Sequence, residues 1–155
     1  MQLNLTGQSV AVLGAARGIG RAIAEGFLAE GCRVCGFDRD PNPLPLPVPG
    51  TWQTGDATSY APVQAFAEAC GEVDHVVFSV GVGSGKFGFP FWNLEPADWA
   101  RVLEVNLIAA VNAAHAFAPR MSRRGRGSLL FLTSDHAKNI TGQTLNIDGG
   151  QVMHA

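Results

Sequence analysis

The chain has few of the residues that would direct it to export, a membrane or nucleic acid. Only 15% of its 155 residues are charged, with a net charge of −2 and a pI near 6.0, so it has no basic field for nucleic acid or an acidic membrane. No apolar run reaches the length of a membrane span, and the N-terminal MQLNLTGQSV has neither a charged nor a long apolar region. These absences favour a cytoplasmic protein.

Cysteine is also scarce, with three residues, Cys32, Cys35 and Cys70. This count fits a reducing compartment better than a disulfide framework. The Cys32-x-x-Cys35 spacing could suggest a metal or redox pair. It falls within an expected strand, however, where odd spacing places side chains on opposite faces, and no second pair of ligands follows. We therefore interpret both thiols as small buried side chains.

The chain is rich in hydrophobic residues, at 46%, and in glycine, with 19 residues, and is expected to form one globular domain over residues 1–155. Short apolar runs alternate with helical patterns along it. Strands are predicted at residues 9–13, 33–38, 51–55, 74–80, 128–133 and 144–147, and helices at residues 19–30, 59–70 and 96–120. This alternation indicates a doubly wound α/β fold, a Rossmann-type parallel sheet with helices on both faces.

Three segments between these elements have a distinct composition. Residues 41–50 (PNPLPLPVPG) contain five prolines and predict an extended connector. Residues 86–93 (KFGFPFWN) are aromatic and either line a substrate or partner surface or pack in the ordinary way. Arg123, Arg124 and Arg126 predict a short, solvated basic loop.

The strongest local signal joins the first strand to the first helix at residues 14–20 (GAARGIG). Gly14 permits a tight turn, Gly18 lets the backbone approach a pyrophosphate, and Gly20 lets the helix pack against the strand. The N-terminus of the helix then faces the phosphates with its N–H groups. This segment therefore predicts a dinucleotide-binding turn.

A carboxylate follows where such a turn needs one. Asp38 ends the second expected strand, where it can accept hydrogen bonds from both hydroxyls of a ribose and would repel a 2′-phosphate. Arg17 and Arg39 support the alternative, since either guanidinium could pair with that phosphate. The sequence favours NAD as the cofactor, with NADP as the less favoured alternative.

The spacing G-x3-G-x-G resembles a known family. Residues 13–20 (LGAARGIG) are similar to the TGxxxGIG fingerprint of the short-chain dehydrogenases/reductases, with Leu13 in place of Thr. Residues 78–81 (FSVG) stand where the family has NNAG and keep only Gly81. Residues 140–150 (ITGQTLNIDGG) are similar to its C-terminal ITGQ-L-VDGG, so the resemblance covers nearly the whole chain.

The resemblance implies roles for single residues. Asp56 and Ala57 match the family's contact with the adenine, and Ile19 and Gly81 belong with the glycines of the turn as cofactor-binding residues. Asn106, in the middle of the third helix, matches the Asn of the catalytic tetrad, which holds a water through a local break in helical hydrogen bonding. We therefore expect a non-ideal turn or a bound water at Asn106.

The family's acid/base pair is missing from this sequence. In a Tyr-x-x-x-Lys motif the Lys lowers the pKa of the phenol, and the Tyr transfers the proton that balances hydride transfer. This chain has one Tyr, Tyr60, with Gln64 four residues later, and neither of its Lys residues, Lys86 and Lys138, follows a Tyr. Since a family member has roughly 250 residues, the top of the usual single-domain range, about ninety are missing here.

The gap falls near residues 129–134. Residues 127–134 (GSLLFLTS) match the strand that ends at the family's catalytic Ser, yet residues 131–137 (FLTSDHA) also resemble the FLASD-x-A that closes its last long helix. Ser134 is therefore either the tetrad Ser or a helix-end Ser.

The link to the last strand raises a geometric problem. The eight residues 135–142 cannot form the crossover of a dozen or more that parallel pairing normally needs, so one sheet face would lack a covering helix. Either the molecule contains further chain, or a true deletion borrows cover from a partner subunit.

Two functions therefore remain open. In the first, the protein is an NAD-dependent oxidoreductase that acts on a small-molecule alcohol or carbonyl, as the resemblance implies, in a homo-oligomer such as a dimer or tetramer. It is active only if the real molecule contains the Tyr/Lys segment. In the second, the same scaffold makes a catalytically silent nucleotide-binding or assembly protein.

Overall fold

The computed structural model describes residues 4–41, 51–86, 91–131 and 143–146. Within them one sheet has the strand order β3-β2-β1-β4-β5-β6. The strands are β1 (Ser9–Leu13), β2 (Arg33–Asp38), β3 (Thr51–Thr54), β4 (His75–Phe78), β5 (Ser128–Phe131) and β6 (Gln143–Asn146). The helices are α1 (Gly18–Ala29), α2 (Tyr60–Cys70), η1 (Phe91–Asn93), α3 (Pro96–Leu103), the π-helical turn η2 (Glu104–Ile108) and α4 (Ala109–Arg124).

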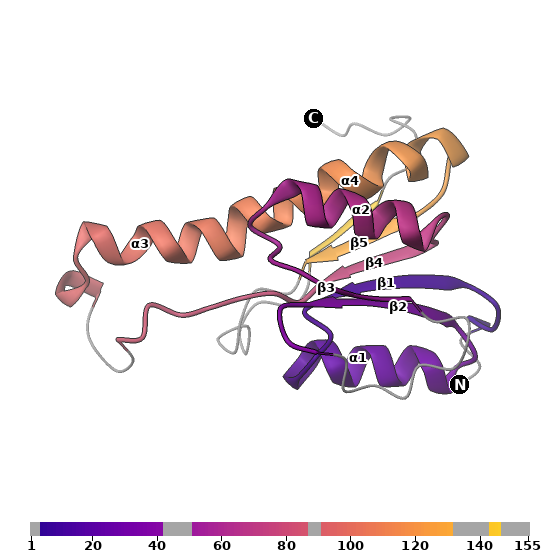
Figure 1. The fold of residues 1–155 in the computed structure, drawn as a ribbon, viewed down its shortest axis with the longest axis horizontal. Helices are drawn as coiled ribbons and strands as arrows, with labels where there is room; N and C mark the ends of the chain where they lie inside the picture. Colours follow the sequence, from indigo (N-terminus) through magenta and orange to yellow (C-terminus); the bar gives the residue numbers. More distant parts are fainter. Residues whose placement is uncertain (1–3, 42–50, 87–90, 132–142, 147–155) are drawn as a thin grey trace.

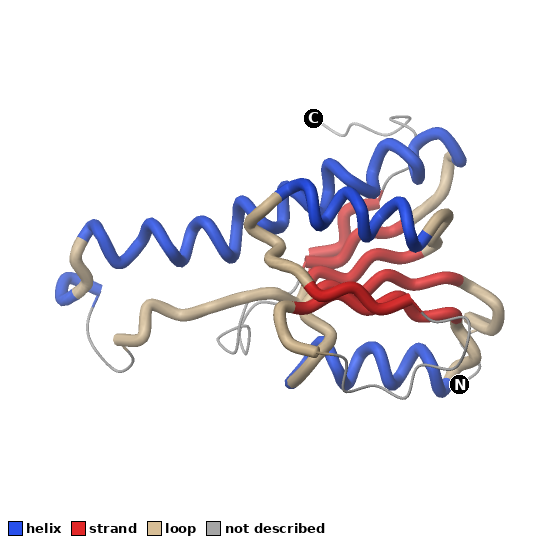
Figure 2. Tube along the Cα trace, in the orientation of Figure 1, coloured by secondary structure: helices blue, strands red, loops and turns tan. Residues whose placement is uncertain are grey.

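The strands β3, β2, β1, β4 and β5 are all parallel, with helices on both faces of the sheet. Figure 1 shows α1 on one face and α2 with α4 on the other. Figure 2 shows the same layers, with the strands between the helices. The doubly wound fold predicted from the alternation of strands and helices is confirmed.

Strand β1 shows why the sequence folds this way. Its apolar residues are buried on both sides of the sheet, as expected for a central parallel strand. Val10 and Val12 pack in the cluster that α1 covers, whereas Ala11 and Leu13 pack in the cluster beneath α2 and α4. The continuous apolar run is therefore the signature of a strand enclosed by two helical layers.

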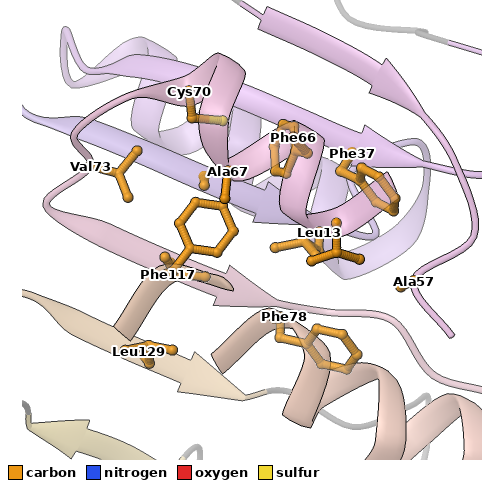
Figure 3. Packing of buried hydrophobic residues seen from close by; sticks show 14 of the residues in the cluster. Leu13, Phe37, Ala57, Phe66, Ala67, Cys70, Val73, Phe78, Phe117 and Leu129 are labelled. Carbon is orange, nitrogen blue, oxygen red and sulfur yellow. The ribbon is translucent and has the colours of Figure 1, made fainter. Parts of the chain in front are cut away.

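The larger core cluster lies between the sheet and helices α2 and α4. Figure 3 shows its aromatic centre, where Phe37 of β2, Phe66 of α2 and Phe117 of α4 meet. The ring centroids of Phe37 and Phe66 are 5.2 Å apart, and those of Phe66 and Phe117 are 5.9 Å apart. These contacts fix both helices relative to the carboxyl ends of the strands.

The three cysteines are buried thiols, as the sequence predicts. Cys32 packs in the cluster beneath α1, whereas Cys35 and Cys70 pack in the cluster on the opposite face. Burial raises the pKa of the Cys70 thiol. The Cys32-x-x-Cys35 pair therefore points to both sides of the sheet.

The longest helix extends beyond the sheet. It begins at Pro96, as predicted, and the Asp98 carboxylate accepts a hydrogen bond from the Glu95 N–H at its start. None of the α3 residues is buried, whereas Phe117 and Met121 of α4 are. Figure 1 shows α3 projecting away from the sheet.

By length and composition alone, the 29 residues Pro96–Arg124 could cross a membrane, with a mean hydropathy of 1.3 in their most apolar window. The sequence prediction that no run reaches this length is therefore wrong for this helix. Helices of a protein core meet the same criterion, and α4 packs against the sheet. The criterion is thus weak evidence for a membrane span.

The predicted basic loop is wrong at Arg124. The helix continues to Arg124 and ends at Gly125, whose φ of +67° provides the left-handed cap. The Arg124 guanidinium lies 2.6 Å from the Asp74 carboxylate, and only 16% of its side chain is exposed. Arg124 therefore joins the helix to the start of β4 instead of lying free in solvent.

The last strand also differs from the prediction. β6 (Gln143–Asn146) pairs with β5 in the antiparallel direction, whereas the sequence predicts a parallel strand at residues 144–147. Residues 132–142 are too few for a parallel crossover, so a strand that follows them pairs directly with its neighbour. The proline-rich residues 42–50 lie outside the described residues.

Candidate functional site

A cleft of about 520 Å³ opens at the carboxyl ends of the parallel strands. In doubly wound folds, ligands bind at this edge, where the strand order reverses between β1 and β4. Its lining includes loops after β1, β2, β3 and β4 and one face of the long helix. The lining residues are Gly14, Arg17, Gly18, Ile19, Phe37, Asp38, Arg39, Gly55, Asp56, Ala57, Ser79, Val80, Gly81, Val82, Gly83, Arg101 and Val105.

Each glycine of the first turn occupies its position for a different physical reason. A Cβ on Gly14, where φ is +87°, would lie 2.7 Å from the Ser79 carbonyl carbon. A Cβ on Gly20 would lie 2.1 Å from the Gly14 carbonyl oxygen, so helix and turn approach too closely for a side chain. Gly18 has a φ of +57° and no atom within 4 Å of a Cβ position, so its surface is open toward the cleft.

Helix α1 begins at this turn, and its N-cap residue provides no side-chain cap. Arg17 has an extended backbone at the N-cap position and its side chain makes no capping hydrogen bond. The first turn of α1 contains no acidic residue. The N–H groups and the positive end of the helix dipole therefore face the cleft and suit an anion such as a pyrophosphate.

Asp38 stands at the end of β2, on the wall of the cleft. Its carboxylate accepts hydrogen bonds from the Ala16 N–H (2.9 Å) and the Asp40 N–H (3.2 Å). These bonds hold the side chain beside the glycine turn and leave lone pairs on both oxygens. Asp38 can therefore accept hydrogen bonds from hydroxyl groups of a ligand in the cleft.

Asp56 follows β3 and forms another part of the wall. The Thr58 backbone N–H donates to its carboxylate at 2.9 Å and is the main cause of a lowered Asp56 pKa, to which Arg39 and Arg101 also contribute. Asn112 of α4 donates to the Ala57 carbonyl at 3.0 Å. These hydrogen bonds thus hold the loop in place and favour the ionised form of the Asp56 carboxyl group.

Asn106 lies in the predicted irregular turn. The helix adopts a π-helical turn over Glu104–Ile108, so the break in regular helical hydrogen bonding expected at Asn106 is confirmed. Its side-chain oxygen accepts from the Val82 N–H (2.8 Å), and its amide donates to the Val82 carbonyl (3.0 Å). Asn106 therefore fixes the loop after β4, which lines the cleft. Such π-turns are frequent at functional sites.

A second contact holds this loop farther out along the helix. Lys86 forms an ion pair with Asp98 of α3 at 2.6 Å, which lowers the Asp98 pKa. Figure 1 shows the segment after β4 running beside α3 between these contacts. The mouth of the cleft is thus flanked by the projecting helix and the loop tied to it.

Most predicted cofactor-binding residues meet in this cleft: Gly14, Arg17, Gly18, Ile19, Asp38, Asp56, Ala57 and Gly81. Gly20 lies beneath the turn, where it packs against Gly14, as its packing role predicts. Ser134 lies outside the described residues.

Sequence reasoning missed Arg101 and Val105 of the helix wall and Val82 of the loop. Arg101 and Val105 are four residues apart on one helix face, in the turn before Asn106, and no signal in the sequence indicates that this face meets the loops of other strands.

Tyr60 lies on α2 and is not among the lining residues of the cleft. Its hydroxyl is 2.9 Å from Nδ1 of His115 on α4, and the two rings meet edge to face. Its position supports a link between two helices and not the donation of a proton in the cleft.

Comparisons with known proteins agree with the fold of this chain. The model of the family described as short chain dehydrogenase matches residues 8–145. The chain is 32% identical over 152 residues to 1-deoxy-11-beta-hydroxypentalenate dehydrogenase of Streptomyces exfoliatus, covering 90% of this chain and 55% of that protein.

Two solved structures share the fold. L-sorbose reductase of Gluconobacter frateurii, complexed with NADPH and L-sorbose, has 26% identity and a TM-score of 0.71, with 83% of this chain and 53% of that chain covered. The 3-ketoacyl-(acyl-carrier-protein) reductase of Brucella melitensis, complexed with NADH, has 24% identity and a TM-score of 0.71, with 79% and 53% covered. The chain thus spans about half the length of the relatives that it matches.

Proposed function

Because this chain belongs to the short-chain dehydrogenase family, we propose that it is the cofactor-binding part of an NAD-dependent oxidoreductase acting on a small-molecule alcohol or carbonyl. One observation carries the proposal: the open backbone at Gly18 and the carboxylate of Asp38 line one cleft at the N-terminus of α1. This combination offers N–H groups for a pyrophosphate and a hydroxyl acceptor for a ribose.

The residues present fit such a cofactor. When bound, NADH supplies a hydride to a carbonyl carbon. Gly18 and Ile19 would hold the pyrophosphate, Asp38 would accept hydrogen bonds from the hydroxyls of the adenosine ribose, and the loop at Asp56 would lie beside the adenine. Asn106 keeps the loop after β4 in place through both hydrogen bonds to Val82.

Catalysis in this proposal depends on a proton donor near the reacting carbonyl. Hydride transfer leaves an alkoxide-like oxygen that needs a positioned acid, and the family's Tyr-x-x-x-Lys is missing from the sequence. The oxidoreductase is therefore active only if the molecule contains that segment, near residues 129–134 of this numbering.

The cofactor choice is tested by titrating the chain with NADH and NADPH in a calorimeter. We expect the unsubstituted chain to bind NADH more tightly than NADPH. The Asp38→Asn substitution should lower the affinity for NADH by about 10- to 100-fold and reduce the difference between the affinities for NADH and NADPH. Asn keeps an oxygen acceptor for the Ala16 N–H, so the turn retains its hydrogen bond. Asp40→Asn is the matched control. A preference for NADPH in the unsubstituted chain would show that Arg17 or Arg39 governs the choice.

A second function, a catalytically silent nucleotide-binding protein, is favoured by the position of Tyr60. The single Tyr of the chain bonds His115 and does not line the cleft. Its test is an NADH oxidation assay with a panel of aldehydes and ketones, on chain whose intact mass is confirmed as 16.3 kDa. Binding without turnover supports the silent function, and rapid turnover rejects it.

We also propose that the protein is a homo-oligomer that pairs through the long helix. Large apolar side chains are at least 41% exposed along it: Trp99, Leu103, Leu107, Ile108 and Val111. A solvent-exposed apolar surface of this kind marks an interaction site. Sedimentation should show that Leu107→Glu lowers the oligomeric state, whereas Ala22→Glu on α1 leaves it unchanged. An equal mass for both variants and the unsubstituted chain would refute this interface.

The cytoplasm is the compartment we propose, because a sequence with three cysteines fits a reducing compartment better than a disulfide framework. Fractionation of cells that express the full-length protein tests it.

A further inference from the structure

We propose that Arg101 of α3 binds the adenine half of the cofactor. The proposal rests on the proposed NAD-binding function and assigns a residue of the helix wall to it. The guanidinium would contact the adenosine monophosphate moiety and not the nicotinamide half.

The position of Arg101 is the first argument. It lines the cleft from the long helix, one turn before Val105, which is buried and lines the same cleft. The next lining residues on this side are Val82 and Gly83 of the loop held by Asn106. Arg101 therefore stands on a face of the helix whose position relative to the sheet is fixed.

The charges of the cleft are the second argument. Its lining contains three cationic side chains, Arg17, Arg39 and Arg101, against two carboxylates, Asp38 and Asp56. The Asp56 pKa is lowered mainly by the hydrogen bonds that Thr58 donates, while burial acts in the opposite direction. The charges of Arg39 and Arg101 make smaller contributions that also lower this pKa. The Arg101 charge is thus felt at Asp56, the wall that bounds the adenine in the proposed binding mode.

The present partner of Arg101 is the third argument. Its guanidinium pairs with Glu104 of the same helix at 2.9 Å, and both side chains are about half exposed, at 50% and 51%. Exposed pairs of this kind contribute little to stability, so the guanidinium can leave Glu104 for a ligand at small cost. A buried or multiply bonded arginine would lack this freedom.

The chemistry of a guanidinium suits this half of the cofactor in two ways. It can lie over the face of an aromatic ring or donate to ring nitrogens, and it can pair with a phosphate. Adenosine and adenosine monophosphate separate these sources, since only the second carries the phosphate.

Helix α1 provides a matched control. Arg21 pairs with Glu25 at 2.8 Å with exposures of 45% and 49%, much like Arg101 and Glu104, but it lies outside the lining of the cleft. Arg21→Gln therefore removes an equivalent surface pair and an equivalent charge without touching the site.

The test is calorimetric titration of the unsubstituted chain, Arg101→Gln, Arg101→Lys and Arg21→Gln with NADH, adenosine monophosphate, adenosine and nicotinamide mononucleotide. We expect Arg101→Gln to weaken NADH and adenosine monophosphate on the order of tenfold and to leave nicotinamide mononucleotide unchanged. If Arg101→Lys recovers the affinity for adenosine monophosphate, the contact is an ion pair with the phosphate. If Arg101→Gln also weakens the binding of adenosine, the contact is with the base. Circular dichroism and thermal unfolding confirm that each variant is folded.

The results that would overturn the role of Arg101 can be distinguished from the result that would overturn the proposed function. If the unsubstituted chain binds NADH and Arg101→Gln binds it as Arg21→Gln does, Arg101 has no role while the proposed function stands. An equal loss for nicotinamide mononucleotide and adenosine monophosphate likewise removes the adenine assignment. If the unsubstituted chain binds neither NADH nor NADPH, the proposed function fails and the role of Arg101 fails with it.

Discussion

Two glycines on the same helix are expected to respond in opposite ways to substitution by alanine. Gly20 and Gly26 both lie in α1. A Cβ at Gly20 would meet the Gly14 carbonyl oxygen at 2.1 Å, the Gly14 carbonyl carbon at 2.9 Å and the Ser79 Cβ at 3.1 Å. A Cβ at Gly26 would have no neighbour within 4 Å. The pair therefore isolates the close packing of the dinucleotide turn from helix propensity.

The magnitudes follow from these contacts. Gly26→Ala removes backbone freedom from the unfolded chain and should raise the free energy of unfolding by about 0.5–1 kcal/mol. Gly20→Ala gains the same propensity but forces α1 about 1 Å away from a backbone oxygen, because ordinary contacts exceed 3 Å. Overpacking of this kind costs roughly 1–3 kcal/mol or more. Because the gain in helix propensity is common to both variants, their free energies of unfolding should differ by the overpacking cost alone, about 1–3 kcal/mol or more, which corresponds to roughly 2–12 °C in Tm.

Urea unfolding followed by circular dichroism measures both effects, with the unsubstituted chain as reference. Gly20→Ala should also bind NADH more weakly, because the turn shifts, while Gly26→Ala should bind it normally. If Gly20→Ala is as stable as Gly26→Ala, the close approach of α1 to the turn is wrong, and with it the account of why this motif carries glycine.

Two further predictions concern the loop after β4 and the opposite edge of the sheet. Asn106→Ala removes both hydrogen bonds to Val82 and should lower the free energy of unfolding by about 1–3 kcal/mol, with faster amide exchange at Val82; unchanged exchange would contradict the role. Burial lowers the pKa of His75 below its ordinary 6.5, so the folded state binds its proton less readily than the unfolded state. The neutral His75 side chain therefore stabilises the fold fully above pH 6.5, and this contribution to the free energy of unfolding declines as the pH falls. Urea titrations between pH 7 and about 5 should show this decline in the unsubstituted chain and not in His75→Gln.

The sheet and the cleft could be predicted because both follow from local patterns. Runs such as residues 9–13 are apolar throughout, which a strand buried on both faces requires. The glycine spacing at residues 14–20 is set by short contacts within the turn and with Ser79. Together with Asp38 it located the part of the cleft formed by the turn after β1 and by the end of β2.

The direction of β6 and the ends of the helices could not be predicted in the same way. Alternation of side chains is the same in parallel and antiparallel strands, so the pattern at residues 143–146 contains no information on the direction of pairing. Arg124 looked like a loop residue because its partner, Asp74, is distant in sequence. Arg101 was missed for the same reason, since the cleft forms only when the helix lies beside loops from other strands.

The π-helical turn at Asn106 has a different status. No propensity in residues 104–108 distinguishes it from a regular helix, and only the resemblance to the family indicated a break there. In the structure, the Asn106 side chain in this turn bonds both backbone groups of Val82, a residue of a loop that is distant in sequence.

The most direct test of the account is a map of backbone amide chemical shifts during titration of the 155-residue chain with NADH. We predict that the largest changes fall at residues 14–20, at Asp38, at Asp56 and its neighbour Ala57, and at Gly81. Amides at the opposite edge of the sheet, near Asp74, should stay unchanged. If NADH saturates the chain while these cleft amides do not move, or if the shifts gather near Asp74, the cleft is not the dinucleotide site.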